Sequence, residues 1–180
     1  YYIDKKKNEK CIGNVYRGRV VNVLPGMEAA FVDIGEEKNA YLYVKDALPK
    51  DINYKGSSAK IQEIVKKGQE IIVQVIKEPS INKGAKVTTH ITLPGRYLVL
   101  TPYSSKINIS RKIHDLEEIE RLYQIGNEIQ RENIGFIFRT QAVGVDKDAL
   151  LNEYTQLINL FHKLERERNF LPCPKLLYKD

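Results

Sequence analysis

At 180 residues, the chain is long enough for one ordinary domain or for two small ones. Hydrophobic residues at 42% and charged residues at 29% are ordinary proportions for a folded globular protein, which excludes wholesale disorder. The formal net charge of +6 favours a polyanionic partner only weakly, because many proteins that bind none share it. Since no apolar run approaches the ~18 residues of a membrane helix and no leader pattern opens the sequence, we expect no membrane partner.

The two cysteines, Cys11 and Cys173, lie far apart without CxxC spacing. They predict neither a zinc site nor a disulfide, and free thiols are typical of a reducing compartment, so we expect a cytoplasmic protein. The first residue is Tyr1, and three lysines follow at residues 5–7. We therefore expect the sequence to begin inside a larger protein.

The first half of the chain has the composition of short β-strands. Five are predicted, each rich in β-branched or aromatic residues and bounded by turn signals, over residues 14–24, 29–34, 40–44, 71–77 and 85–92. Residues 46–60 carry Pro, Gly and Ser without a sustained period and predict a long surface connection. Five short strands with one long connection indicate a small closed or partly open β-barrel.

Beyond the barrel, strand and helix patterns mix, which indicates a second unit. Apolar runs of strand length lie at residues 96–100 and 134–139. Asp115 followed by Glu118 resembles a capping box, and apolar residues at helical spacing after it predict a short helix that ends near residue 123.

A long helix follows Gly144, with Asp146 or Asp148 as its cap. Its apolar residues recur at steps of four and three: Leu150, Tyr154, Leu157, Phe161 and Leu164. Because this heptad spacing lasts barely two repeats, we interpret the stripe as core-facing and not as a coiled coil.

Aromatic residues of the second and third strands lie opposite to the apolar set. Because successive side chains of a strand face opposite ways, Phe31 shares its face with Asp33, and Tyr41 shares its face with Tyr43. Such rings stack bases at roughly 1–3 kcal/mol per base, and these strands are the usual ligand surface of a five-stranded barrel. Lys83, in the loop before the fifth strand, is placed to reach a phosphate. Alternatively, the rings cover the barrel against the second unit and Lys83 is only solvated.

Long motifs run through nearly the whole chain: GNVYRGRV at 13–20, LPGMEAAFVDIG at 24–35, NKGA at 82–85, LPGRYLVL at 93–100, ISRKI at 109–113 and FRT at 138–140. With them the sequence resembles the ribonuclease E/G family. The resemblance implies an all-β OB-fold of the S1 type over residues 10–89, after the remnant of an RNase H-like segment at 1–9. Over residues 90–180 it implies a small α/β (α+β) domain similar to the family's 5′ sensor, with a C-terminal helix and a return to the RNase H-like segment.

The resemblance also implies roles for single residues in RNA binding. In the family, the S1 domain holds single-stranded RNA on an aromatic pair, which falls here on Phe31 and Tyr41, aided by a lysine, which falls on Lys83. With Tyr43 added from the strand pattern, these residues are the expected RNA-binding set.

The sensor of the family recognises the 5′-monophosphate of an RNA. Its phosphate-binding residues correspond to Arg139, Thr140, Arg111, Gly95 and Val99. An arginine with a neighbouring hydroxyl suits a terminal phosphate, because the guanidinium donates two charge-assisted hydrogen bonds. On the pattern alone, Arg139 and Thr140 only end a strand, and the Val99 side chain belongs to the core.

The sequence departs from the family in two respects. Lys112 stands where many members have a second arginine. The family's DNase I-like domain, with its metal-binding aspartates and CPxC zinc link, has no counterpart, and Cys173 lies in Cys-Pro-Lys. We therefore expect no catalytic residue, metal or cofactor in this chain; Mg²⁺ and a structural Zn²⁺ are implied only for the full-length member. The other domains of a parent enzyme, and homo-oligomers formed through them, are further expected partners.

Catalysis by the chain itself has little support in the residues. Asp146 and Asp148 are weak candidates for Mg²⁺ ligands, because aspartate at a helix start is favoured as a cap. His90, His114 and His162 are scattered. We therefore predict the RNA-binding, 5′-monophosphate-sensing part of an endoribonuclease, inactive alone. A generic single-stranded RNA adaptor without 5′-end sensing is the alternative, and a self-sufficient nuclease is a third hypothesis.

Overall fold

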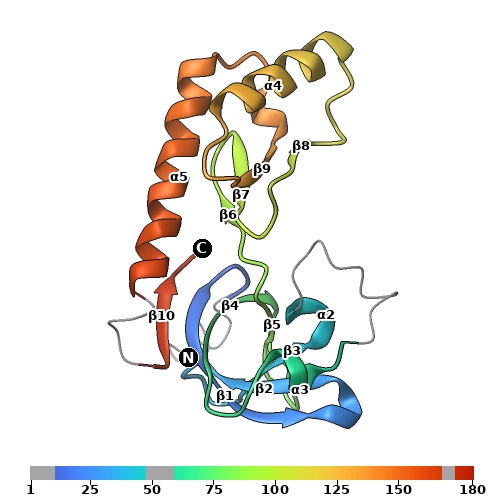
Figure 1. Ribbon diagram of the computed structural model, residues 1–180, viewed down its shortest axis with the longest axis vertical. Coiled ribbons are helices and arrows are strands. Elements are labelled where there is room, and N and C mark those ends of the chain that lie inside the picture. The colour runs from blue at the N-terminus through green and yellow to red at the C-terminus, as the bar shows by residue number, and fades with distance from the viewer. Residues whose placement is uncertain (1–10, 48–58, 168–172) are drawn as a thin grey trace, which may run out of the picture. The chain divides into compact units, whose positions relative to one another are not determined.

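A computed structural model describes residues 11–47, 59–167 and 173–180 (Figure 1). The predicted remnant at residues 1–9 and most of the predicted connection at 46–60 lie outside the described residues. The chain divides into two compact units, one made of His90–Arg166 and the other of the preceding barrel together with Glu167–Asp180. None of the helices that the structure describes has the length and hydropathy of a membrane-spanning segment.

The first unit is a closed β-barrel (Figure 1). Its strands are β1 (Val15–Leu24), β2 (Ala29–Asp33), β3 (Ala40–Tyr43), β4 (Glu70–Lys77) and β5 (Lys86–Thr88). They pair in the order β1-β2-β3-β5-β4, and β4 returns to β1 to close the sheet. Only the β3–β5 pair is parallel. This is the predicted five-stranded OB-type barrel, so the fold class is confirmed, although β5 is shorter than the predicted strand.

The barrel interior is filled by alternate side chains of these strands. Its best-buried members are Val20, Ala30, Val32, Ala40, Leu42, Val73, Val75 and Val87. Val32 lies opposite Val20 on β1 and opposite Ala40 on β3, so three neighbouring strands contribute side chains to the same inner layer. Burial of these side chains, most of them β-branched valines, removes apolar surface from water and stabilises the closed form.

Three short elements complete the barrel. A 3₁₀ turn, η1 (Pro25–Met27), joins β1 to β2, and two short helices, α2 (Val44–Ala47) and α3 (Ile61–Ile64), flank the residues that the structure does not describe. The strand patterns predicted neither helix, because one turn is too short to show a helical period.

A further strand, β10 (Lys175–Tyr178), pairs antiparallel with the beginning of β1. Val15 lies opposite Tyr178, and Arg17 lies opposite Lys175. The sequence assigned residues 90–180 to the second domain and predicted no strand at this end. In the structure this segment extends the sheet of the first unit, since its pairing partner is 160 or so residues away in sequence and leaves no local signal.

The second unit is a small four-stranded sheet with two helices. Its strands are β6 (Leu93–Pro94), β7 (Leu98–Thr101), β8 (Ile107–Ile109) and β9 (Gly135–Phe138), in the order β6-β7-β9-β8 with β8 and β9 parallel. The helices are α4 (Leu116–Ile129) and α5 (Lys147–Glu167), and a 3₁₀ turn, η3 (Thr140–Ala142), follows β9. The mixed α/β class predicted for this unit is thus confirmed.

The long helix α5 packs on the sheet through its predicted stripe. Tyr154 lies against Phe136, with 4.7 Å between ring centroids, and its hydroxyl donates to the carbonyl oxygen of Ile134 at 2.7 Å. Leu150, Leu157 and Leu164 of the stripe are also buried, whereas Phe161 is only half-buried. The cap is Asp146, whose Oδ1 accepts from the N–H of Ala149 at 2.9 Å.

Helix α4 begins at the predicted cap but is longer than predicted. Asp115 Oδ1 accepts from the N–H of Glu117 at 3.0 Å. Glu118 does not complete the capping box, because its carboxylate binds Arg121 and the N–H of Gly144. The neighbouring Arg121 guanidinium lowers the pKa of Glu118. The helix continues to Ile129 since Ile125 and Ile129 extend its buried face.

Candidate nucleic-acid interface

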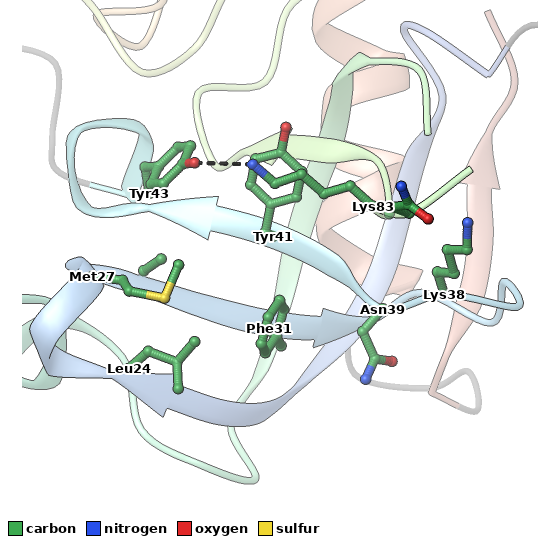
Figure 2. A pocket seen from close by; sticks show the side chains of 11 residues that line it. Leu24, Met27, Phe31, Lys38, Asn39, Tyr41, Tyr43 and Lys83 are labelled. Atoms are coloured by element: carbon green, nitrogen blue, oxygen red, sulfur yellow. Dashed lines mark hydrogen bonds between the residues drawn. The ribbon is translucent and has the colours of Figure 1, made fainter. Parts of the chain in front are cut away.

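A pocket of about 350 Å³ lies on the outer face of β2 and β3, beside the loop that precedes β5 (Figure 2). Rings, apolar side chains and amino groups from separate segments line it: Leu24, Met27, Ala29, Phe31, Lys38, Asn39, Tyr41, Tyr43, Asn82, Lys83 and Gly84. The structure therefore brings all four residues of the predicted RNA-binding set to one site.

The aromatic rings gather because of the register between β2 and β3. Phe31 lies directly opposite Tyr41, while the neighbouring pair Ala30 and Leu42 points into the barrel core. Tyr43 follows Tyr41 on the same face, and their rings meet edge to face with centroids 5.3 Å apart. The alternation in the sequence thus predicts which face the rings share.

Lys83 lies over these rings. Its Nζ is 4.1 Å from the centroid of the Tyr41 ring, within the range of a cation–π contact. It also donates a hydrogen bond to the hydroxyl oxygen of Tyr43 at 3.3 Å, and this bond raises the pKa of Lys83. Tyr41 is only 6% exposed, and a cation lies over its ring, so the ring is not the open platform that the strand pattern alone suggests.

A second cation, Lys86, also lies near the Tyr43 ring. Lys86 Nζ is 5.4 Å from the centroid of the Tyr43 ring and 3.9 Å from Asp46 Oδ2. Two amino groups and three rings therefore lie within one surface region, a combination suited to a ligand that has both flat rings and negative charge.

Lys38 holds the loop that carries Lys83. Its Nζ donates to the carbonyl oxygens of Ser80, at 2.7 Å, and of Ile81. Sequence reasoning missed Lys38, because it stands in a polar run and its partners lie 42 and 43 residues further on. The same loop is pressed against β3 at Gly84, where a Cβ atom would lie 2.0 Å from the carbonyl oxygen of Asn39. Only glycine permits this approach.

The five predicted phosphate-binding residues belong to one region of the second unit. Arg111 and Arg139 follow the carboxyl ends of the parallel strands β8 and β9, which meet at the same edge of the sheet. The start of β7 lies at that edge too, because Leu98 is opposite Phe138. Gly95 and Thr140 are therefore at this edge, and Val99 is one residue pair inside it, half-buried.

Arg139 is fixed to the loop before β7. Its Nη1 donates to the carbonyl oxygen of Gly95 at 2.7 Å, and its backbone N–H donates to the carbonyl oxygen of Tyr97 at 2.7 Å. The side chains of Arg139, Thr140 and Arg111 are exposed. The exposed guanidinium has further N–H groups besides the one bound to Gly95, and such groups can bind an anion.

No metal site accompanies these residues in the part of the chain that the structure describes. No group of three or more His, Cys, Asp or Glu side chains lies close enough there to hold an ion. Asp146 caps α5, His90 lies against Tyr103, and His162 pairs with Glu132 at 3.0 Å. The residues present do not fit the Mg²⁺ or Zn²⁺ that the resemblance implies for a full-length protein, so no chemical step through a metal follows from them.

The fold and the pocket define an OB-type barrel with an aromatic, basic pocket on its outer face, joined to a small α/β unit. Residues 92–180 match the model of the Ribonuclease E/G family. The chain is 41% identical to Ribonuclease G of Escherichia coli (strain K12) over 174 residues, which are 93% of this chain and 36% of that protein. It is 39% identical to Ribonuclease E of Nostoc sp. over 170 residues, 94% of this chain and 24% of that protein.

Among solved structures, GSP13 from Bacillus subtilis is 25% identical, with a TM-score of 0.34, over 44% of this chain and 54% of that one. The sequence relatives cover both units at high identity, and the family model matches most of the second unit and β10. The chain therefore belongs to the ribonuclease E/G family. It spans little more than a third of the length of the Escherichia coli relative.

Proposed function

We propose that this chain binds single-stranded RNA in the pocket of Phe31, Tyr41, Tyr43 and Lys83, as the RNA-binding part of a ribonuclease E/G-type endoribonuclease. The contact between Lys83 and Tyr41 carries the proposal, because the ammonium occupies the kind of position over a ring that a nucleobase takes when it stacks. A base that stacks on Tyr41 displaces the ammonium from the ring. The displaced ammonium then neutralises the adjoining phosphate.

Single strands fit this surface better than duplexes do. Stacking on Phe31 and Tyr41 requires bases whose faces are free, and a duplex offers none except at its ends. Stacking also tolerates any base, since every base has a π-face. We therefore expect little sequence preference in the first unit.

The second unit supports a proposal about the end of the strand. Arg139 and Thr140 are consecutive exposed residues just after β9, and Arg111 lies just beyond the end of the neighbouring strand β8. Such a group favours a 5′-terminal monophosphate, which carries more negative charge and more free oxygens than an internal diester. We propose that this edge senses the 5′-monophosphate of the RNA that the barrel holds.

A paired binding experiment tests this function. The 180-residue chain is titrated with one single-stranded RNA in two forms that differ only in a 5′-monophosphate or a 5′-hydroxyl, and dissociation constants are read from fluorescence anisotropy. We expect binding of both and a preference of about tenfold for the monophosphate, which Arg139→Ala abolishes. Equal affinity would contradict the sensor and leave a generic RNA adaptor; no binding of either form would contradict the whole proposal.

A further inference from the structure

The carboxylate of Glu153, on α5, binds the backbone of the loop that precedes β7. Glu153 accepts hydrogen bonds from three successive backbone N–H groups, those of Arg96 at 2.6 Å, Tyr97 at 2.8 Å and Leu98 at 2.9 Å. The loop is closed as a turn by a hydrogen bond from the N–H of Gly95 to the carbonyl oxygen of Leu98 at 2.8 Å. Consecutive N–H groups that point in one direction form a concave site for an anion, and here the chain's own side chain fills it.

The Glu153 carboxylate lies so close to Gly95 that a side chain at position 95 would displace it. A Cβ atom on Gly95 would lie 2.6 Å from Cδ of Glu153 and 2.8 Å from both of its oxygens. The φ angle of Gly95 is not in the left-handed region, so the glycine leaves space for the Glu153 carboxylate and does not serve an unusual backbone conformation.

The same loop holds Arg139 from its opposite side. The carbonyl oxygen of Gly95 accepts from Nη1 of Arg139, and the carbonyl oxygen of Tyr97 accepts from the N–H of Arg139. Glu153 thus binds the donors of the loop while Arg139 binds its acceptors. The position of the guanidinium therefore depends on a loop conformation that the Glu153 carboxylate stabilises.

We infer that Glu153 is the positioning residue of the 5′-phosphate site, because it fixes the Gly95–Leu98 turn and, through the Gly95 carbonyl, the direction of the Arg139 guanidinium. The inference rests on the proposed function of that site. It has a second consequence. Because Glu153 already accepts hydrogen bonds from the backbone N–H groups of residues 96–98, the RNA phosphate is bound by the side chains of Arg139 and Thr140 and not by the loop backbone.

The charge of Glu153 supplies a competing explanation with the opposite sign. A carboxylate near a phosphate site repels the phosphate, so removal of a merely repulsive charge strengthens phosphate binding. Removal of a positioning contact weakens it. The two roles are therefore separated by the direction of the change.

The test compares Glu153→Ala and Glu153→Gln with the unmodified chain, using the two RNA forms described above. The readout is the ratio of the dissociation constant for the 5′-hydroxyl form to that for the 5′-monophosphate form. We expect Glu153→Ala to lower this ratio about tenfold, to nearly one, with unchanged affinity for the 5′-hydroxyl form. Glu153→Gln keeps an acceptor oxygen in the turn, so we expect it to retain most of the preference. Gln156→Ala, an exposed change on the same helix, is the matched control.

A double variant asks whether Glu153 acts through Arg139. In the Arg139→Ala background, Glu153→Ala should change the ratio no further, and independent effects would contradict the inference. The backbone amide signals of residues 96–98 and the guanidinium Nε–H signal of Arg139, followed by NMR, should both shift in Glu153→Ala. The NMR spectrum also shows whether Glu153→Ala is folded. If it is not, the isosteric variant Glu153→Gln is used in its place, and its binding ratio is compared with its NMR shifts at residues 96–98 and at Arg139.

Three outcomes are separable. A preference in the unmodified chain that survives Glu153→Ala, or that grows in it, overturns the inference and leaves the proposed function intact. A ratio of one in the unmodified chain overturns the proposed function and, with it, this role of Glu153. A preference that falls in Glu153→Ala, survives in Glu153→Gln and depends on Arg139 is the expected result.

Discussion

The Lys83 ammonium lies 4.1 Å from the centre of the Tyr41 ring. The two residues are brought together by a loop that Lys38 ties down and that glycine at position 84 allows to touch β3. Contacts within the barrel unit thus hold the Lys83 ammonium against the aromatic face of β3. If RNA binds at this face, as we propose, preorganisation of this kind lowers the entropy lost on binding.

Lys83→Met removes the charge and keeps most of the length of the side chain. If Lys83 neutralises a phosphate in the complex, the affinity for single-stranded RNA falls and the slope of log K against log salt concentration becomes shallower by about 0.7. Binding titrations across a salt series measure both quantities. Lys66→Met is the control, because Lys66 is an exposed lysine of the same unit that does not line the pocket. Equal slopes in the two variants would refute the phosphate contact.

Phe31→Ala removes the ring opposite Tyr41. We expect a loss of about 1–3 kcal/mol of binding free energy per stacked base, with the same loss for different RNA sequences and an unchanged salt slope. Because Phe31 is half-buried on the outer face, the thermal midpoint of the chain should fall little. Tyr123→Ala, which removes an exposed ring from α4, should leave RNA binding unchanged. If Phe31→Ala binds as tightly as the parent, the ring does not stack.

Gly84→Ala tests whether the loop must touch β3. The added methyl group would meet the carbonyl oxygen of Asn39, so we expect a loss of about 1–3 kcal/mol in the free energy of unfolding, together with weaker RNA binding as Lys83 moves away from Tyr41. Gly26→Ala is the matched control, since a Cβ atom there meets no atom within 4 Å. Urea unfolding measures the free energy of unfolding of both variants. A Gly84→Ala chain as stable as Gly26→Ala would show that the contact is not required.

Cys11 should resist alkylation in the folded chain. Burial and the hydrogen bond from its Sγ to Glu78, at 3.2 Å, raise the pKa of the thiol from 9.0 to about 12. The raised pKa stabilises the fold fully below pH 9, and this contribution is lost as the pH rises toward 12, because the unfolded chain releases the proton first. At pH 9, in a Cys173→Ser background, iodoacetamide should react on the order of several hundredfold more slowly with the folded chain than with the chain in urea.

The role of Glu78 in this effect has its own variant. Glu78→Gln removes the negative charge beside the thiol, which lowers the pKa of Cys11 and should speed alkylation of the folded chain. Equal rates for the folded and the unfolded chain in the parent would contradict the effect of burial.

The strand pattern predicted the barrel well. Each strand buries one face, so its apolar residues alternate with a period of two, and this pattern can be recognised within a single short strand. The faces of Phe31, Tyr41 and Tyr43 followed from that same period. Local patterns could not show how far a strand continues once its side chains stop alternating, which is why β5 is shorter than expected. The strand at 175–178 was missed because its partner, β1, is distant in sequence.

Contacts between distant residues had no sequence signal. In the sequence, Lys38 is an ordinary lysine of a polar turn. Glu153 is an ordinary acidic residue on the polar face of α5. Their roles depend on backbone groups 42 and 43 residues later for Lys38, and 55 to 57 residues earlier for Glu153. The N-cap of helix α4 was predicted correctly. The helix was predicted too short because its buried residues beyond Tyr123 were not included in the apolar stripe.

The most direct test of the central claim is an NMR titration of the 180-residue chain with single-stranded RNA that carries a 5′-monophosphate, and with its 5′-hydroxyl twin. We predict that both RNAs shift the ring signals of Phe31, Tyr41 and Tyr43, and that only the monophosphate form shifts the signals of Arg139 and Thr140. Unchanged ring signals at saturating RNA would contradict RNA binding by the barrel, and equal shifts of Arg139 with both forms would contradict recognition of the 5′ end.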